Sequence, residues 1–161
     1  MTIAERLLPK LSEWQPVGTG RQDWSQTLAE TDWTLDLAAD RVDTLGCLLW
    51  EMTLTRADAE PVANALLKEQ ALKAADRATG LMEPLHFLEL DELRGQALLR
   101  SESPAKRGTA LTYYEILMTA GREITVRRYR IDPEQNPRRD RIAFALTHEA
   151  IAKLVDDLVR G

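Results

Sequence analysis

Arginine and tyrosine side chains are concentrated in one stretch of this 161-residue chain, between Arg100 and Arg141. Planar guanidinium groups form paired hydrogen bonds with carboxylates or phosphates, and tyrosine rings stack on bases or on other guanidinium groups. The chemistry that this stretch predicts is therefore the recognition of an anionic partner. The candidate partner-binding residues are Arg127, Arg128, Tyr129, Arg130, Arg138, Arg139 and Arg141.

The charge of the chain is distributed unevenly along its length. Residues 100–141 carry ten Lys or Arg against six Asp or Glu, whereas residues 1–99 carry nine against seventeen, and the net charge is −5. Such asymmetry often marks a partner surface. A nucleic-acid-binding domain usually has a basic balance overall, so the acidic total favours a protein partner with an acidic surface over nucleic acid. A simpler interpretation stays open, in which the arginines are solvated or pair with the acidic N-terminal half.

No other motif in the chain has the spacing that catalysis or cofactor binding requires. Gly18 and Gly20 begin like a dinucleotide-binding fingerprint, but Asp23 stands where the third glycine belongs. The two histidines, His86 and His148, lie 62 positions apart and predict no metal site. We therefore expect no catalytic residues, no metal and no cofactor, and we expect His148 on the exposed first turn of a helix.

Composition indicates a soluble protein of the cytoplasm. The chain is 44% hydrophobic and 29% charged, and its longest uncharged apolar run, 44–50, is too short to cross a bilayer. The N-terminus does not have the pattern of a signal peptide. Cys47 is the only cysteine, so no intrachain disulfide is possible, and its apolar neighbours predict a buried thiol.

The elements that would position these side chains begin with a helix over residues 2–14. Thr2 and Glu5 fit a capping box, while Pro9 predicts a short or kinked helix. Residues 33–37 alternate like a half-buried strand, with a turn at residues 40–41. Residues 45–54 are apolar in both phases, which predicts a central strand covered on both faces, with Trp50 buried. Trp33 is expected in the core, and Trp24 has no evident place.

The second half of the chain predicts more strands between two helices. A helix over 59–78 would be capped by Asp58 and ended by Gly80. A hairpin is expected over residues 85–100, followed by a polar loop over 101–108 and long antiparallel strands over 109–119 and 122–131. The change of phase between residues 127 and 128 suggests a bulge.

The C-terminal part is expected to contain a rigid polar loop over 132–140, a short strand over 141–146 and a helix. Thr147 can cap this helix, and an apolar stripe follows it at helical spacing. The stripe consists of Ile151, Leu154, Val155, Leu158 and Val159. The whole pattern predicts one α+β domain over residues 1–161, with helices packed on an antiparallel sheet.

This order of elements resembles the small acidic type III secretion chaperone-like domains. The resemblance rests on the predicted hairpin at 33–54 and the predicted helices at 59–78 and 147–159, together with size and acidity. It implies a dimeric binding module without catalytic residues. We accordingly expect a non-enzymatic protein-binding or adaptor module that forms a homo-oligomer through an edge strand or an adjoining surface. The alternative is a small enzyme or ligand-binding domain, with a pocket near His86 or Cys47.

Overall fold

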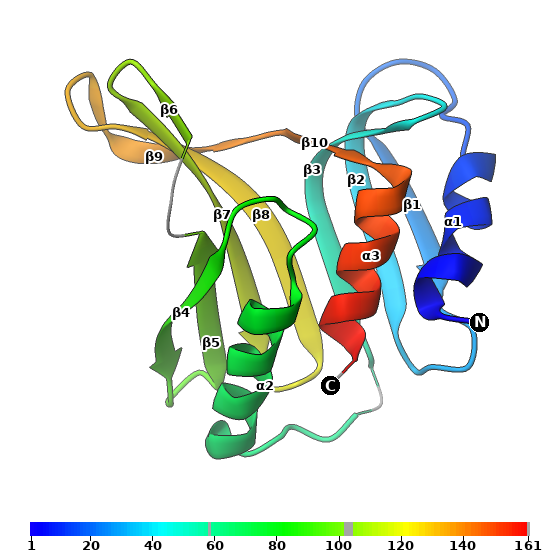
Figure 1. The fold of residues 1–161 in the computed structure, drawn as a ribbon, viewed down its shortest axis with the longest axis horizontal. Helices are drawn as coiled ribbons and strands as arrows, with labels where there is room; N and C mark the ends of the chain where they lie inside the picture. The colour runs from blue at the N-terminus through cyan, green and yellow to red at the C-terminus, as the bar shows by residue number, and fades with distance from the viewer. Residues whose placement is uncertain (58, 102–104, 161) are drawn as a thin grey trace.

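One antiparallel sheet runs through the molecule and carries three helices, which confirms the predicted α+β class (Figure 1). The computed structural model describes residues 1–57, 59–101 and 105–160. The main strand order is β1-β2-β3-β8-β7-β5-β4, while β10 pairs with β3, β9 with β8 and β6 with β7. The strands are β1 (Gln22–Thr27), β2 (Thr34–Val42), β3 (Gly46–Thr55), β4 (Leu85–Asp91), β5 (Gln96–Ser101), β6 (Ala105–Arg107), β7 (Ala110–Thr119), β8 (Glu123–Asp132), β9 (Asn136–Ile142) and β10 (Phe144–Thr147).

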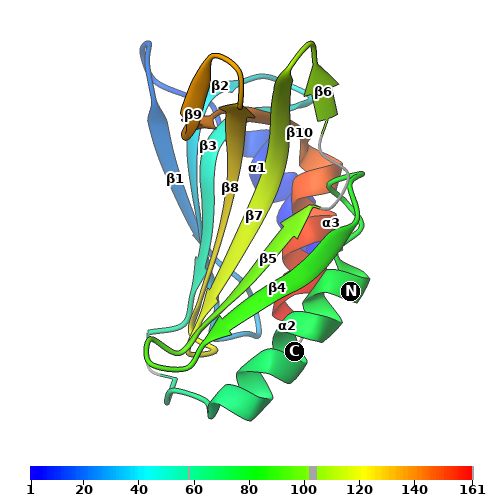
Figure 2. The ribbon, with the colours of Figure 1, turned by 90° about the vertical axis from the view of Figure 1, so that its left-hand side faces the viewer.

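The described helices all lie on the same face of the sheet. They are α1 (Ile3–Glu13), α2 (Asn64–Arg77) and α3 (His148–Val159). Figure 2 shows the sheet with its helices on one side. The core fills the space between them, where Leu35, Met52, Ile116, Val126 and Leu154 are fully buried. We call the other side the open face, because no described helix covers it.

Local capping chemistry places two of the helix ends. Thr2 and Glu5 form the predicted capping box of α1, and the helix continues through Pro9 to residue 13. Thr147 caps α3 by accepting a hydrogen bond from the backbone N–H of Ala150 at 3.0 Å. Residue 58, the predicted cap of the middle helix, lies outside the described residues. α2 begins six residues after that position, and its N-cap residue, Ala63, makes no side-chain cap.

Two bulges change the phase of the central strands and correct the prediction for Trp50. Between Ala38 and Arg41 the pairing of β2 with β3 shifts twice. As a result, Trp50 of β3 has no paired residue on β2, and Asp40 of β2 has no paired residue on β3. Cys47 and Leu49 before the bulge therefore share the helix-covered face with Met52 and Leu54 after it. β3 is central, as expected, but one face is open, and Trp50 is only half-buried there.

The remaining strands confirm part of the predicted pattern. β4 and β5 form the expected hairpin, and β7 pairs with β8 in an unbroken register, so the bulge predicted at residues 127–128 is wrong. The predicted polar loop at 132–140 is also wrong over most of its length, because β9 forms there by pairing with β8. The predicted loop at 101–108 is interrupted by β6, and residues 102–104 lie outside the described part.

Strand β1 was missed by the sequence analysis and accounts for Trp24. Trp24 lies in β1 and stacks on Trp14, with ring centroids 5.6 Å apart. The predicted turn at residues 40–41 is wrong, because β2 continues through Val42 and Asp43 makes the turn instead. The Asp43 carboxylate accepts hydrogen bonds from the backbone N–H groups of Leu45 and Gly46, which lowers its pKa.

Candidate protein-binding site

The seven predicted partner-binding residues do not form one patch. Paired residues of neighbouring antiparallel strands share a face, and neighbours along a strand alternate. Arg127 and Tyr129 of β8 therefore lie on the open face, and Tyr129 pairs with Arg141 of β9. Arg139, two residues before Arg141, joins them. Arg128 and Arg130 belong to the opposite phase, and Arg138 lies where the pairing of β8 with β9 is irregular.

Arg128 is held by contacts within the protein. Its side chain is only 12% exposed on the helix-covered side and forms an ion pair with Glu83 at 3.0 Å. It also donates a hydrogen bond to the Thr112 hydroxyl and lies 4.1 Å from the centroid of the Tyr114 ring. Arg130 lies 3.8 Å from Asp132 in the same strand. The contacts of Arg128 are thus internal to the protein, and its contact with a partner stays a prediction.

A tryptophan between two arginines marks the centre of the open face. The guanidinium carbons of Arg21 and Arg141 lie 4.2 and 4.4 Å from the centroid of the Trp50 ring. Arg21 also pairs with Asp40, the extra residue of the neighbouring bulge, at 2.8 Å. The two bulges thus bring Trp50 and Asp40 together, and Arg21 bridges them. Sequence analysis missed Arg21, because it lies far outside the arginine-rich stretch.

Glu51 and Glu115 each hold two arginines on this face. Arg127 pairs with Glu51 at 2.7 Å, and Arg141 lies 3.8 Å from the same carboxylate. Arg100 pairs with the buried Glu115 at 2.6 Å, and Arg139 donates to the same oxygen atom. The pairs with Glu51 agree with the simpler interpretation, in which arginines pair with the acidic N-terminal half, whereas Glu115 lies within the arginine-rich stretch itself.

The rings of two tyrosines lie beneath these ion pairs. Tyr113 and Tyr129 stack with centroids 5.9 Å apart. Arg100 lies over the Tyr113 ring, and Arg139 lies 3.8 Å from the centroid of the Tyr129 ring. Burial opposes the charge of Arg139, but its hydrogen bonds to Tyr113 and Glu115 outweigh this effect and raise its pKa. The guanidinium groups of Arg100 and Arg139 therefore lie against aromatic rings as well as against a carboxylate.

Positive charge exceeds negative charge in this network. Five guanidinium groups, those of Arg21, Arg100, Arg127, Arg139 and Arg141, face three carboxylates, those of Asp40, Glu51 and Glu115. Burial and the neighbouring guanidinium of Arg127 lower the pKa of Arg141. The Nε atom of Arg141 is buried and has no hydrogen-bond partner among the described residues. Within these ion pairs the guanidinium groups outnumber the carboxylates by two, and two further carboxylates, those of Asp23 and Asp36, line a hollow beside Glu51 on the same face. We call this network the arginine face.

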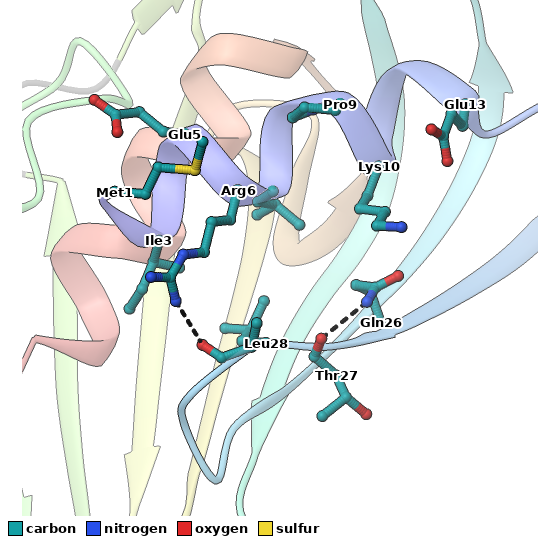
Figure 3. A pocket seen from close by; sticks show the side chains of 12 residues that line it. Met1, Ile3, Glu5, Arg6, Pro9, Lys10, Glu13, Gln26, Thr27 and Leu28 are labelled. Atoms are coloured by element: carbon teal, nitrogen blue, oxygen red, sulfur yellow. Dashed lines mark hydrogen bonds between the residues drawn. The ribbon is translucent and has the colours of Figure 1, made fainter.

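An apolar groove lies between α1 and β1, and β1 is an edge strand of the sheet (Figure 3). This groove encloses about 360 Å³, and Ile3, Leu7 and Leu28 make much of its apolar lining. Arg6 and Lys10 extend from α1 towards β1 in Figure 3. Arg6 pairs with Glu30 at 2.8 Å. The groove therefore combines an apolar floor with a rim of mixed charge, because Glu5 and Glu13 line it as well as Arg6 and Lys10, and it lies beside a strand that has only one neighbour.

The residues considered for catalysis or metal binding are dispersed. Cys47 lies in β3 and His86 in β4, and β8, β7 and β5 separate these strands. Burial and the nearby Asp43 carboxylate raise the pKa of the Cys47 thiol to about 11. His148 is 4% exposed, so the prediction of an exposed histidine is wrong. Within the described ranges, no three His, Cys, Asp or Glu residues are grouped so that they could hold a metal ion.

The comparisons with known proteins add no identification. No protein-family model, no curated protein and no solved structure matches this chain. In the described part of the chain, no helix is long and apolar enough to span a membrane.

Proposed function

We propose that this chain is a non-enzymatic binding module that captures a protein partner through an acidic segment. One observation carries the proposal: an uncovered sheet face presents Trp50 between Arg21 and Arg141, in a network with surplus guanidinium charge. Tryptophan and arginine are the residue types most enriched among those that dominate binding energies at protein interfaces. Guanidinium groups match carboxylates in geometry as well as in charge. The partner surface is therefore acidic at its point of contact.

The groove between α1 and β1 supports a partner that binds in an extended conformation. A strand at the edge of a sheet can accept an additional strand through main-chain hydrogen bonds, while a nearby pocket receives alternate side chains. Leu7 and Leu28 offer such a pocket for an apolar side chain, and Lys10 on its rim can pair with an acidic residue next to it. An extended acidic segment with an apolar side chain would therefore suit the arginine face and the groove between α1 and β1.

The cytoplasm is the compartment that we propose for this module. Cys47 is a free, buried cysteine, as is usual in a reducing compartment. The alternative function is a small enzyme or ligand-binding domain, and hollows lined by Cys47 with Asp43 and by His86 with Glu83 favour it. The chemistry of the thiol gives it less support. A cysteine nucleophile acts as its thiolate, and the raised pKa of Cys47 keeps the thiol protonated near neutral pH.

The proposal is tested with defined peptides and a matched pair of double variants. Fluorescence anisotropy measures binding of labelled acidic, neutral and basic peptides, each containing one leucine, to the wild-type protein and to Arg127→Gln/Arg141→Gln. We expect the acidic peptide alone to bind the wild type, with an affinity that falls as salt screens the attraction. The double variant should bind it at least about tenfold more weakly.

The control variant, Arg94→Gln/Arg122→Gln, removes the same charge from exposed positions outside the arginine face. It should bind like the wild type, apart from a small effect of net charge. Equal weakening by the two double variants would show that net charge acts without a site. Absence of acidic-peptide binding at low salt, with the fold intact by circular dichroism, would reject the proposal.

A further inference from the structure

A second exposed surface lies at the other edge of the sheet, along α2 and β4. A hollow of about 550 Å³ separates the helix from this edge strand. Leu72 of α2 is 49% exposed there, and Met82 in the following loop is 91% exposed. Phe87 of β4 lines the same hollow. We call this surface the α2–β4 face. It shares no residue with the arginine face, and the inference below goes beyond the proposed function.

Backbone geometry holds Met82 outward. Its φ angle is +59°, in the left-handed region that residues with a side chain seldom adopt. The backbone N–H of Met82 donates a hydrogen bond to the carbonyl of Thr79 at 3.2 Å. An apolar side chain that is almost fully exposed on a strained backbone is unfavourable in isolation. Covering it with another apolar surface would offset part of that cost.

The charges on α2 make this surface complementary to itself. Lys68 lies one helical turn before Leu72, and Asp76 lies one turn after it. If two copies of α2 pack antiparallel about a two-fold axis at Leu72, Lys68 of each copy faces the partner's Asp76. An interface with two-fold symmetry requires this kind of reciprocity, in which each surface contacts its own equivalent.

The backbone of β4 is less suited to association than the side chains of this surface, because it is poorly shaped to pair with a strand of another copy. Leu88 is an extra residue between Phe87 and Glu89, so a bulge interrupts the strand opposite β5. Bulges on edge strands discourage the addition of another strand. The side chains of the α2–β4 face, more than the strand edge, are therefore available for association.

We propose that the α2–β4 face is a homodimer interface, with Leu72 near the two-fold axis and with Lys68 paired with the partner's Asp76. The sequence predicted a homo-oligomer formed either through an edge strand or through an adjoining surface. In the proposed dimer, the contact is made by the adjoining surface. The two copies would leave both arginine faces open, because α2 lies on the helix-covered side of the sheet and the arginine face lies on the open face (Figure 2).

Sedimentation velocity between about 1 and 100 µM tests the interface with a matched pair of substitutions. Leu72→Asp should raise the dimer dissociation constant at least about tenfold. Leu66→Asp is the control, because Leu66 lies on the same helix with a similar exposure of 45% but outside the hollow. It should leave the dimer intact.

A charge swap tests the predicted register. Lys68→Asp and Asp76→Lys should each weaken the dimer, since each creates two like-charge contacts across the axis. The variant that carries both substitutions restores opposite charges and should dimerise to within about threefold of the wild type. A monomeric wild type at about 100 µM, equal effects of the two leucine variants, or a swap that fails to restore association would overturn the proposal. Far-ultraviolet circular dichroism of each variant distinguishes lost association from lost folding.

Discussion

Glu115 shows how a single residue organises the arginine face. Its carboxylate is buried between Arg100 and Arg139, whose guanidinium groups stay partly exposed. A buried carboxylate is stable only when hydrogen bonds and opposite charges replace its hydration. Two guanidinium groups supply both at Glu115. The same arrangement orients the arginines over Tyr113 and Tyr129, so the ion pairs also fix the planes that a partner would meet.

The buried thiol of Cys47 predicts a loss of stability at high pH. Burial raises its pKa from near 9 to about 11, so the folded state retains a proton that the unfolded state loses. The stabilisation is present below about pH 9 and disappears as the pH rises towards 11. Urea unfolding of the wild type and of Cys47→Ala from pH 7 to 11 should show the difference in unfolding free energy shrinking by about 1–3 kcal/mol. A constant difference over this range would contradict the prediction.

At the level of elements, the junction of β3, β10 and α3 depends on a close backbone approach. A Cβ atom at Gly46, the first residue of β3, would lie 2.4 Å from the carbonyl oxygen of Leu146 and 2.9 Å from Thr147 Cα. The backbone N–H of His148 also donates to the carbonyl of Leu45 at 2.9 Å. A glycine at position 46 therefore allows β10 to pair with β3 and α3 to begin directly after it.

Gly46→Ala should consequently destabilise the protein by about 2–3 kcal/mol, because the added methyl group meets backbone atoms and not a flexible side chain. Gly80→Ala is the control, since a Cβ there would meet its nearest atom at an ordinary 3.5 Å. Its unfolding free energy should change by less than about 1 kcal/mol. Thermal and urea unfolding measure the stability of both variants. Similar losses of unfolding free energy in the two variants would show that the close backbone approach at Gly46 does not require a glycine.

At the level of the whole molecule, the two faces of the sheet have opposite roles. The helix-covered face holds the core, whereas the open face carries charged and aromatic side chains. Trp33 and Trp50 offer a direct comparison, because an arginine lies over each ring. Trp33 is 6% exposed within the core, while Trp50 is half-buried on the open face.

Trp33→Ala should reduce the free energy of unfolding by about 3–5 kcal/mol, as expected for a large buried aromatic residue. Trp50→Ala should reduce it by only about 1–2 kcal/mol, because the ring keeps solvent contact and loses mainly its arginine neighbours. The same variant should weaken acidic-peptide binding. Urea unfolding provides the stabilities, and a larger loss for Trp50 than for Trp33 would contradict this division of the sheet.

Features that depend on a few neighbouring residues could be predicted from the sequence. Thr2 and Thr147 cap their helices, and alternating apolar residues mark most of the strands, because capping bonds and side-chain alternation act over two to four positions. The α+β class and the arginine-rich stretch followed from such local signals.

The remaining features depend on how strands that are distant in the sequence pair with one another. These features include which residues come together in the candidate site. The bulge at Trp50 depends on how β2 and β3 align, and β9 forms against β8 without an apolar pattern of its own. The hydrogen bond from Arg127 to Glu51 joins residues 76 positions apart. Local sequence carries no signal for such a contact, because it exists only once the sheet has made β3 and β8 neighbours. For this reason, Arg127, Tyr129, Arg139 and Arg141 come together with Arg21 and Trp50 on the open face, whereas Arg128 lies on the helix-covered side.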